Sequence, residues 1–170
     1  MTKRSYIIHR LCHLSFWTAV ALLLGYIESF IPFYPGIAGM KLGLPNLVIV
    51  VLLSYASWKD ALYVNLLRIL LNGFLFGNGY SILFSLSGGL LSLLIMSLFH
   101  HWQFHIYNVS IAGGICHNLG QIFIAIVLTS TPQLLYYFPF LIICGSLCGL
   151  CNGAIAKTLL AHLPNQITRH

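Results

Sequence analysis

Six long apolar stretches, separated by short polar breaks, make up almost all of this 170-residue sequence. They cover residues 12–33, 41–57, 61–77, 80–99, 108–130 and 134–158. A membrane-spanning helix needs about 20 apolar residues, so six spans use roughly 130 positions. The loops and tails that remain are too short for a soluble catalytic domain. The sequence therefore predicts an all-α, polytopic membrane protein built as a bundle of six transmembrane helices.

Composition supports this prediction, because 59% of the residues are hydrophobic and 6% are charged, and the mean hydropathy is +0.91. The acidic residues are Glu28 and Asp60, against eight Lys and Arg, which gives a formal net charge of +6. A basic excess can indicate nucleic-acid binding. In so apolar a chain it is better explained by membrane orientation, since Lys and Arg are retained on the cytoplasmic side. We therefore expect no nucleic-acid partner.

The distribution of basic residues predicts that both termini are cytoplasmic. The expected organisation is a cytoplasmic tail at 1–11, one six-helix transmembrane domain at 12–158, and a second cytoplasmic tail at 159–170, in the cytoplasmic membrane. The first apolar run lacks a clear cleavage site, so we interpret it as a retained helix. This orientation places Lys41 alone outside and the following residues inside: Lys3, Arg4, Arg10, Lys59, Lys157 and Arg169.

Polar side chains within a predicted span are functional candidates, because a bilayer makes them costly. Asn65, Arg68 and Asn72 are spaced i, i+3, i+7 and share one helical stripe, which cannot face lipid. Arg68 could tie helices together through carbonyl or carboxylate groups. Equally, it could hold an anionic group of a substrate. The residues alone leave both interpretations open.

Glu28 lies in the outer half of the first predicted helix, at a depth that differs from that of Arg68 by roughly 6 Å. The two side chains could form an ion pair, and Glu28 could equally pair with Lys41, which the following loop returns to the same surface. Such a pair would be a structural clamp, since lone buried charges are unfavourable. The alternative is a pocket in which a ligand shares these charges.

Three further polar residues, His117, Asn118 and Gln121, fall near the middle of the fifth predicted helix, and His117 and Gln121 share a face. Hydrogen bonds between helices explain any one of them, but three within five residues favour a cavity opposite Arg68. Cys144, Cys148 and Cys151 are better explained as small packing residues. The histidines of the 100–105 segment suit an interfacial position, so we predict neither a metal site nor a cofactor.

Small residues predict where helices approach closely. Ala21 and Gly25 are spaced i, i+4 on the first helix, a pattern that allows tight contact with another helix. Such a contact can be internal packing. On a terminal helix it could instead dock a partner subunit.

Several ordered segments resemble the Gx transporter family, which also carries the label heptaprenyl diphosphate synthase component I. The resemblance extends from about residue 15 to about residue 156 and rests on short motifs that are fairly specific together. The segments are YIESFIP (26–32), PG (35–36), KLGLPN (41–46), LRILLNG (67–73), LFGN (75–78), SGG (87–89), HNLGQ (117–121) and LYY (135–137).

This resemblance implies a protein similar to the substrate-binding S components of energy-coupling-factor (ECF) transporters. Such a protein has six helices, two cytoplasmic termini and a small-molecule pocket near the outer surface. Its first helix docks, here through Ala21 and Gly25, onto a membrane coupling protein driven by two cytoplasmic ATPases. The sequence carries no Walker A motif of its own. Pro45 and Asn72 stand where the family has small residues.

The enzymatic label conflicts with the chemistry, because polyprenyl diphosphate synthases bind Mg²⁺-diphosphate through clustered aspartates, and this chain has a single Asp. We therefore expect no enzymatic activity. The preferred hypothesis is uptake of a small anionic metabolite such as a vitamin, isoprenoid or quinone precursor. Alternatives are a noncatalytic accessory subunit of a polyprenyl diphosphate synthase and a stand-alone ion-coupled carrier with Glu28 as the titrating group. The expected substrate-binding residues are Glu28, Lys41, Asn46, Arg68, Asn72, His117, Asn118 and Gln121.

Overall fold

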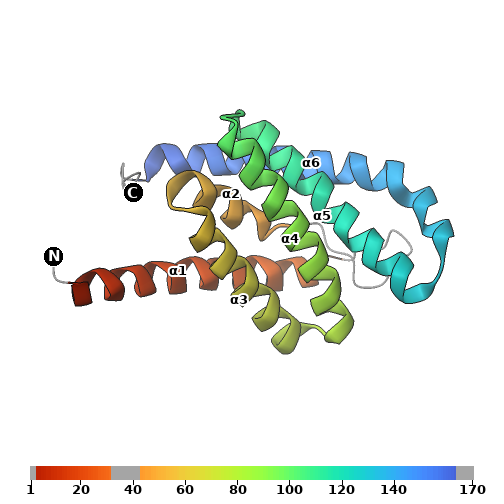
Figure 1. Cartoon of the computed structure of the whole chain (residues 1–170), viewed down its shortest axis with the longest axis horizontal. Helices are drawn as coiled ribbons and strands as arrows, with labels where there is room; N and C mark the ends of the chain where they lie inside the picture. Colours follow the sequence, from red (N-terminus) through yellow and green to blue (C-terminus); the bar gives the residue numbers. More distant parts are fainter. Residues whose placement is uncertain (1–2, 32–42, 164–170) are drawn as a thin grey trace.

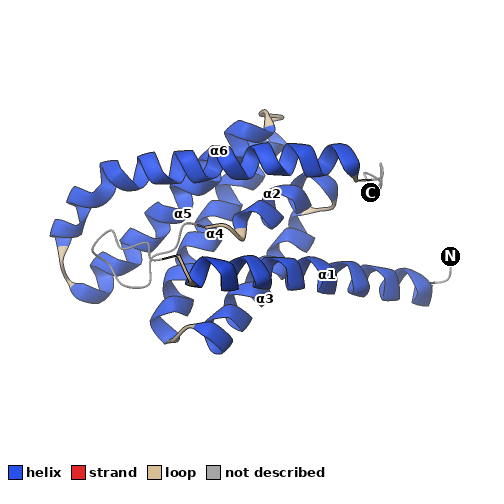
Figure 2. Ribbon diagram, turned by 180° about the vertical axis from the view of Figure 1, so that it is seen from behind, coloured by secondary structure: helices blue, strands red, loops and turns tan. Residues whose placement is uncertain are grey.

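The computed structural model describes residues 3–31 and 43–163, and the regular secondary structure in these ranges is entirely helical (Figures 1 and 2). The predicted all-α class is confirmed. A short 3₁₀ helix, η1, joins the last two α-helices. The elements are α1 (Lys3–Ser29), α2 (Asn46–Tyr55), α3 (Trp58–Phe76), α4 (Gly79–His101), α5 (Ile106–Thr129), η1 (Pro132–Tyr137) and α6 (Phe138–His162).

The shortest α-helix, α2, lies at the centre of the bundle and contacts each of the other five α-helices. Its residues 48–52 are at most 1% exposed. A helix that is apolar on all sides must be covered on all sides, and α2 has this character. Trp17 and Ala21 of α1, Val64 of α3 and Ala156 of α6 pack around it. The hydrophobic core is therefore built around α2.

The predicted number of six spans is not confirmed. Its 10 residues rise about 15 Å, half of the roughly 30 Å hydrocarbon core. Within the described residues, four segments are long and apolar enough to cross a membrane: 4–29, 79–101, 106–129 and 132–162. The α3 helix has 19 residues but carries Lys59, Asp60 and Arg68. The chain is a multi-pass membrane protein, and within the described part of the apolar run predicted as a span at 41–57, α2 extends from Asn46 to Tyr55.

The two ends of the helical bundle can be identified from the positions of α1 and α6. The first turns of α1 and the last turns of α6 lie on the same side of the molecule in both views (Figures 1 and 2). The α1 helix begins at Lys3 and therefore includes most of the predicted tail at 1–11, and α6 continues to His162, beyond the boundary predicted at 158. That this side faces the cytoplasm remains a prediction.

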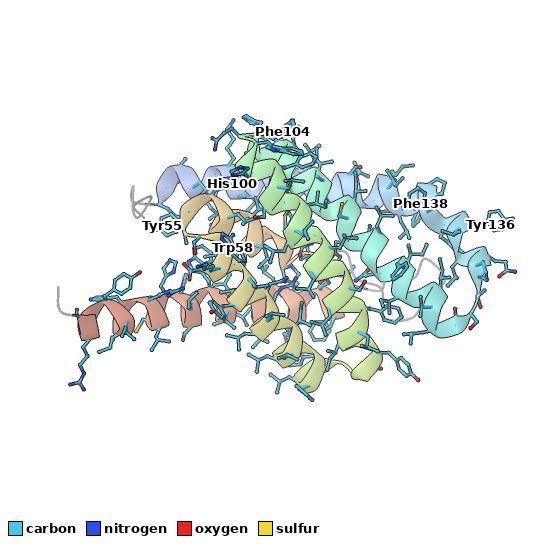
Figure 3. All side chains as sticks on the ribbon, in the orientation of Figure 1. Tyr55, Trp58, His100, Phe104, Tyr136 and Phe138 are labelled. Atoms are coloured by element: carbon cyan, nitrogen blue, oxygen red, sulfur yellow. The ribbon has the colours of Figure 1, made fainter. Side chains whose placement is uncertain are left out.

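Aromatic side chains lie towards both ends of the bundle (Figure 3). Trp58 and Phe104 lie towards the end that holds the start of α1 and the end of α6, whereas Tyr136 and Phe138 lie at the opposite end. Trp58 and Tyr136 are strongly exposed, at 54% and 86%. Amphipathic rings favour the interfaces between membrane and water, so this distribution fits a membrane-spanning bundle.

Close contact between α5 and α6 depends on glycine. A Cβ atom on Gly114 would collide with the carbonyl oxygen of Gly145, and one on Gly149 would lie 2.6 Å from the Ser110 carbonyl oxygen. Small residues at such contacts let two membrane helices approach closely. The glycines of α6 therefore serve internal packing, as do Ala21 and Gly25 of α1.

Candidate functional site: a buried arginine among amides

The predicted polar stripe of α3 faces the interior of the bundle. Asn65, Arg68 and Asn72 are 0%, 4% and 5% exposed. Their spacing places them on one face of the helix, whereas other residues of α3, including Leu67, Leu70 and Leu71, are exposed. The expectation that the stripe avoids lipid is confirmed.

Asn65 and Asn46 hold the guanidinium group of Arg68. The Nε and Nη2 atoms of Arg68 donate to Oδ1 of Asn65, at 3.0 and 2.7 Å, and Nη2 also donates to Oδ1 of Asn46, at 3.1 Å. Asn65 in turn donates from Nδ2 to the carbonyl oxygen of Gly89 on α4, at 3.0 Å. The arginine is thus fixed between α2, α3 and α4 by neutral amide groups.

No carboxylate within the described ranges lies at ion-pair distance from Arg68. The ion pair that these ranges contain joins Arg10 and Asp60. Glu28 and Arg68 therefore do not form the direct ion pair that the sequence left open as one of two alternatives. Glu28 is buried, attracts Arg68 through a longer-range coulombic interaction, and accepts hydrogen bonds from the backbone N–H groups of Gly43 and Leu44. Lys41, the other predicted partner, lies outside the described residues.

Gly43 connects this cluster to α6. It adopts a φ of +85°, a left-handed conformation that suits glycine. Its N–H donates to Glu28, and its carbonyl oxygen accepts from the backbone N–H of Asn46, at 3.0 Å, and from Nδ2 of Asn152, at 3.3 Å. The sequence interpretation missed Asn152, although an amide in the apolar run of α6 is a signal of the same kind as Asn65.

His117 and Gln121 face the same interior region from α5. His117 is 2% exposed and Gln121 is fully buried, and their side chains hydrogen-bond at 3.1 Å, with Nε2 of Gln121 donating to Nε2 of His117. A Cβ atom on Gly43 would lie 3.2 Å from Cδ2 of His117 and 3.0 Å from Nδ2 of Asn46. The imidazole ring therefore adjoins the segment that leads into α2.

Asn118 is placed differently from the prediction. Its Nδ2 atom donates to the carbonyl oxygen of Leu141 on α6, at 2.9 Å. One residue further along a helix means a rotation of about 100°, so Asn118 faces α6 while His117 faces Gly43. The structure assigns Asn118 to the contact between α5 and α6, and it does not join the polar cluster around Arg68.

The predicted docking residues of α1 are buried by the chain's own helices. Ala21 is fully buried in the core around α2. Gly25 packs against the side chain of Asn72 so closely that a Cβ atom there would collide with it. Both residues are therefore used for contacts within the bundle, and their role in docking a partner stays a prediction.

Some polar atoms of the cluster have no hydrogen-bond partner among the described residues. They are Nδ2 of Asn46 and Oδ1 of Asn72, and Nη1 of Arg68 also takes part in none of the bonds described above. Buried polar atoms are normally satisfied, and an orphaned one needs an explanation. Nδ2 of Asn46 and Nη1 of Arg68 are hydrogen-bond donors, and Nη1 belongs to the positively charged guanidinium group. Chemically, the arrangement can bind an anion or an acceptor-rich group.

A groove of the described chain lies away from the Arg68 cluster. It has a volume of about 710 Å³ and runs between α1 and α3, and none of the predicted substrate-binding residues lines it. Within residues 3–31 and 43–163, no three His, Cys, Asp or Glu side chains gather as a metal site would require, and the five cysteines are unpaired.

Comparison with known proteins gives one result for this chain. The family model described as heptaprenyl diphosphate synthase component I matches residues 17–159, which is most of the sequence. No curated protein and no solved structure matches the chain. The family description names one component of an enzyme complex, which implies a partner subunit. The sequence resemblance is thereby confirmed, and the chain belongs to the heptaprenyl diphosphate synthase component I family.

Proposed function

We propose that this chain is the substrate-binding membrane subunit of an uptake system for a small anionic metabolite, similar to the S component of an ECF transporter. The observation that carries the proposal is the state of Arg68. This cation is almost fully buried, and its hydrogen bonds within the described residues all go to the neutral amides of Asn65 and Asn46.

Burial of a cation without an anionic contact is costly, because several kcal/mol of hydration are lost per ion. Neutral amides replace part of the lost hydration but supply no opposite charge. An anionic ligand supplies it, with Nη1 of Arg68 and Nδ2 of Asn46 as the donors that remain. Oδ1 of Asn72 is available to a hydroxyl or N–H group of the same ligand. A carboxylate or phosphate of a vitamin, isoprenoid or quinone precursor has this chemistry.

The nearby carboxylate of Glu28 limits how much negative charge the site accepts. Glu28 and Arg68 are the buried charged residues of the described chain, so their formal charges cancel before a ligand arrives. A ligand with a single negative charge adds less repulsion than a diphosphate. The proposed site also includes His117, which adjoins Gly43, and Gln121, which hydrogen-bonds to His117. Lys41, which comes two residues before Gly43 in the sequence, is kept in it as well.

Energy for uptake comes, in this proposal, from a membrane coupling protein and two cytoplasmic ATPases. Because Ala21 and Gly25 are buried, a partner that docks on α1 contacts its exposed side chains. Phe16, Leu23 and Ile27 are 60%, 60% and 52% exposed and follow one another at helical spacing. Large exposed apolar side chains on a membrane helix also suit lipid, so partner capture is part of the test.

The test is native mass spectrometry of the full chain, extracted in mild detergent from its own membrane. We expect a co-purified small anion on the unmodified protein and its loss in Arg68→Gln. Lys157→Gln is the matched control, because Lys157 lies over the ring of Tyr107, away from the cluster, and that variant retains the molecule. Equal retention by all three proteins, with unchanged helical content, contradicts the proposal.

A second function is favoured by the family description, which names a component of a prenyl diphosphate synthase. In this alternative the chain is a noncatalytic membrane subunit that binds a soluble prenyltransferase. Affinity purification separates the two functions: a coupling protein with ATPases supports uptake, and a prenyltransferase supports the alternative. Uptake by the purified chain in vesicles without ATPases contradicts both and supports a stand-alone carrier.

A further inference from the structure

Asn152 is a buried amide on the face of α6 that packs against the rest of the bundle, and it is 5% exposed. A buried amide costs free energy unless it is hydrogen-bonded. Nδ2 of Asn152 donates to the carbonyl oxygen of Gly43, at 3.3 Å. This bond joins α6 to the segment that leads into α2. The other buried residues of α6 are small or apolar: Leu141, Gly145, Gly149, Gly153 and Ala156.

The backbone that carries Asn152 is fixed against α5. Gly149 and Gly153 lie close to Asn152 in the sequence, and both are in tight contact with α5. A Cβ atom on Gly149 would lie 2.6 Å from the carbonyl oxygen of Ser110, and one on Gly153 would lie 3.1 Å from Cβ of Ser110. Packing this close leaves α6 little freedom to shift. Asn152 therefore extends its amide from a rigid support.

Gly43 connects Asn152 to the first turn of α2. The carbonyl oxygen of Gly43 also accepts from the backbone N–H of Asn46, at 3.0 Å, and the next two residues of the chain make bonds of the same i, i+3 kind. The residue before α2 is Pro45, and the helix has no side-chain cap. The orientation of this turn therefore depends on Gly43, which Glu28 holds at its N–H and Asn152 holds at its carbonyl oxygen.

The side chain of Asn46 is the part of this turn that reaches the candidate site. Its Oδ1 atom accepts from Nη2 of Arg68, at 3.1 Å, and its Nδ2 atom has no hydrogen-bond partner among the described residues. A Cβ atom on Gly43 would lie 3.0 Å from that Nδ2 atom. Gly43 thus lies against the amide, and a change in its orientation displaces the donor group beside Arg68.

We propose that Asn152 is a positioning residue of the anion site. It holds the carbonyl oxygen of Gly43, and thereby keeps the Asn46 amide with one end on the guanidinium group of Arg68 and the other end towards the ligand. The effect on binding is indirect, because Asn152 supports a residue that contacts the ligand and does not contact it itself. This role in binding rests on the proposed function, whereas the placement of Asn46 does not.

Nuclear magnetic resonance of the full chain in detergent, labelled with isotopic asparagine, tests the placement without a ligand. The side-chain amide signals of Asn46 are assigned by their loss in Asn46→Ala. Asn152→Leu keeps a branched side chain but lacks the donor, and Asn152→Ala removes the donor without adding bulk. We expect both variants to shift the Asn46 side-chain signals and to speed hydrogen exchange of the Asn46 backbone N–H by about tenfold.

Two controls separate positioning from a general loosening of α6. The side-chain signals of Asn118, which donates to Leu141 at another point of α6, stay in place in both Asn152 variants. Thr158→Val, an isosteric change on the exposed side of α6, leaves the Asn46 signals unchanged. Unchanged Asn46 signals in both Asn152 variants overturn the inference. Equal displacement of the Asn118 signals also overturns it, because the whole contact between α5 and α6 would then have loosened.

Titration with acetate and with inorganic phosphate tests the role in binding. The proposed function predicts that one of these anions shifts the Asn46 signals of the unmodified chain and has no effect on them in Arg68→Gln. We expect the anion concentration at half-saturation to rise about tenfold in Asn152→Leu. Equal half-saturation in the variant and the unmodified chain overturns the role of Asn152 in binding. No response of the unmodified chain to either anion contradicts the proposed function alone, since the ligand-free spectra decide the placement of Asn46.

Discussion

Arg10 and Arg68 are stabilised in opposite ways. Arg10 is 41% exposed and forms an ion pair with Asp60 at 2.7 Å. Arg68 is 4% exposed and is held by neutral amides. An exposed pair of this kind contributes little to stability, since water already solvates both charges. A buried cation without a contacting anion is costly in the ligand-free protein. This cost suggests that Arg68 is retained because it binds an anionic ligand.

The largest expected effect comes from Arg68→Met. Removal of one partner from a buried charge contact costs about 4 kcal/mol of binding, or about a thousandfold in affinity for the co-purified anion. The stability of the ligand-free protein falls by about 1–3 kcal/mol, because the Oδ1 atoms of Asn65 and Asn46 lose their donor while the desolvation penalty of the guanidinium is removed. Native mass spectrometry measures the first quantity and chemical unfolding in detergent the second. A destabilisation of several kcal/mol with normal binding would make Arg68 a structural clamp.

The second expected effect concerns the acceptor that holds Arg68. Asn65→Leu removes the oxygen that receives two N–H groups of the guanidinium, so a buried cation loses much of its solvation. We expect a destabilisation of about 3 kcal/mol. Asn108→Leu, on the exposed first turn of α5, is the matched control and shifts stability by less than about 0.5 kcal/mol. Equal melting temperatures for the two variants would contradict the assigned role of Asn65.

Sequence reasoning reached the polar stripe of α3 because helical spacing converts directly into a shared face. It also identified the membrane class, because apolar length alone sets that limit. It grouped Asn118 with His117, although i, i+1 neighbours on a helix face different partners. Apolar content predicted a span at 41–57, but apolar content does not set the length of a helix, and α2 has 10 residues. The burial of Ala21 and Gly25 depends on which helix lies against α1, and a small-residue pattern does not specify that partner.

A third expected effect tests the contact between α1 and α3. Gly25→Val pushes a branched side chain into the amide of Asn72, and overpacking of this kind costs about 1–3 kcal/mol. Combination with Asn72→Ala removes the obstacle, so the double variant is more stable than the sum of the two single changes predicts. Thermal unfolding of the four proteins measures the coupling. Strict additivity would show that Gly25 and Asn72 do not touch in the folded protein.

The smallest expected effect concerns the exposed arginine. Asp60→Asn removes the ion pair with Arg10 and weakens the cap of α3, in which Ser57 accepts from the backbone N–H of Asp60 at 3.2 Å and donates to the Asp60 carboxylate at 2.9 Å. Because both charged groups remain accessible to water, we expect a loss of about 0.5–1 kcal/mol that shrinks as salt is raised. The effect of Asn65→Leu is insensitive to salt, since the Arg68 cluster is shielded from ions by the bundle. Unfolding at low and high ionic strength therefore distinguishes the two arginines. A loss of stability in Asp60→Asn that is large and independent of salt would show that the Arg10–Asp60 pair is as much a part of the core as the Arg68 cluster.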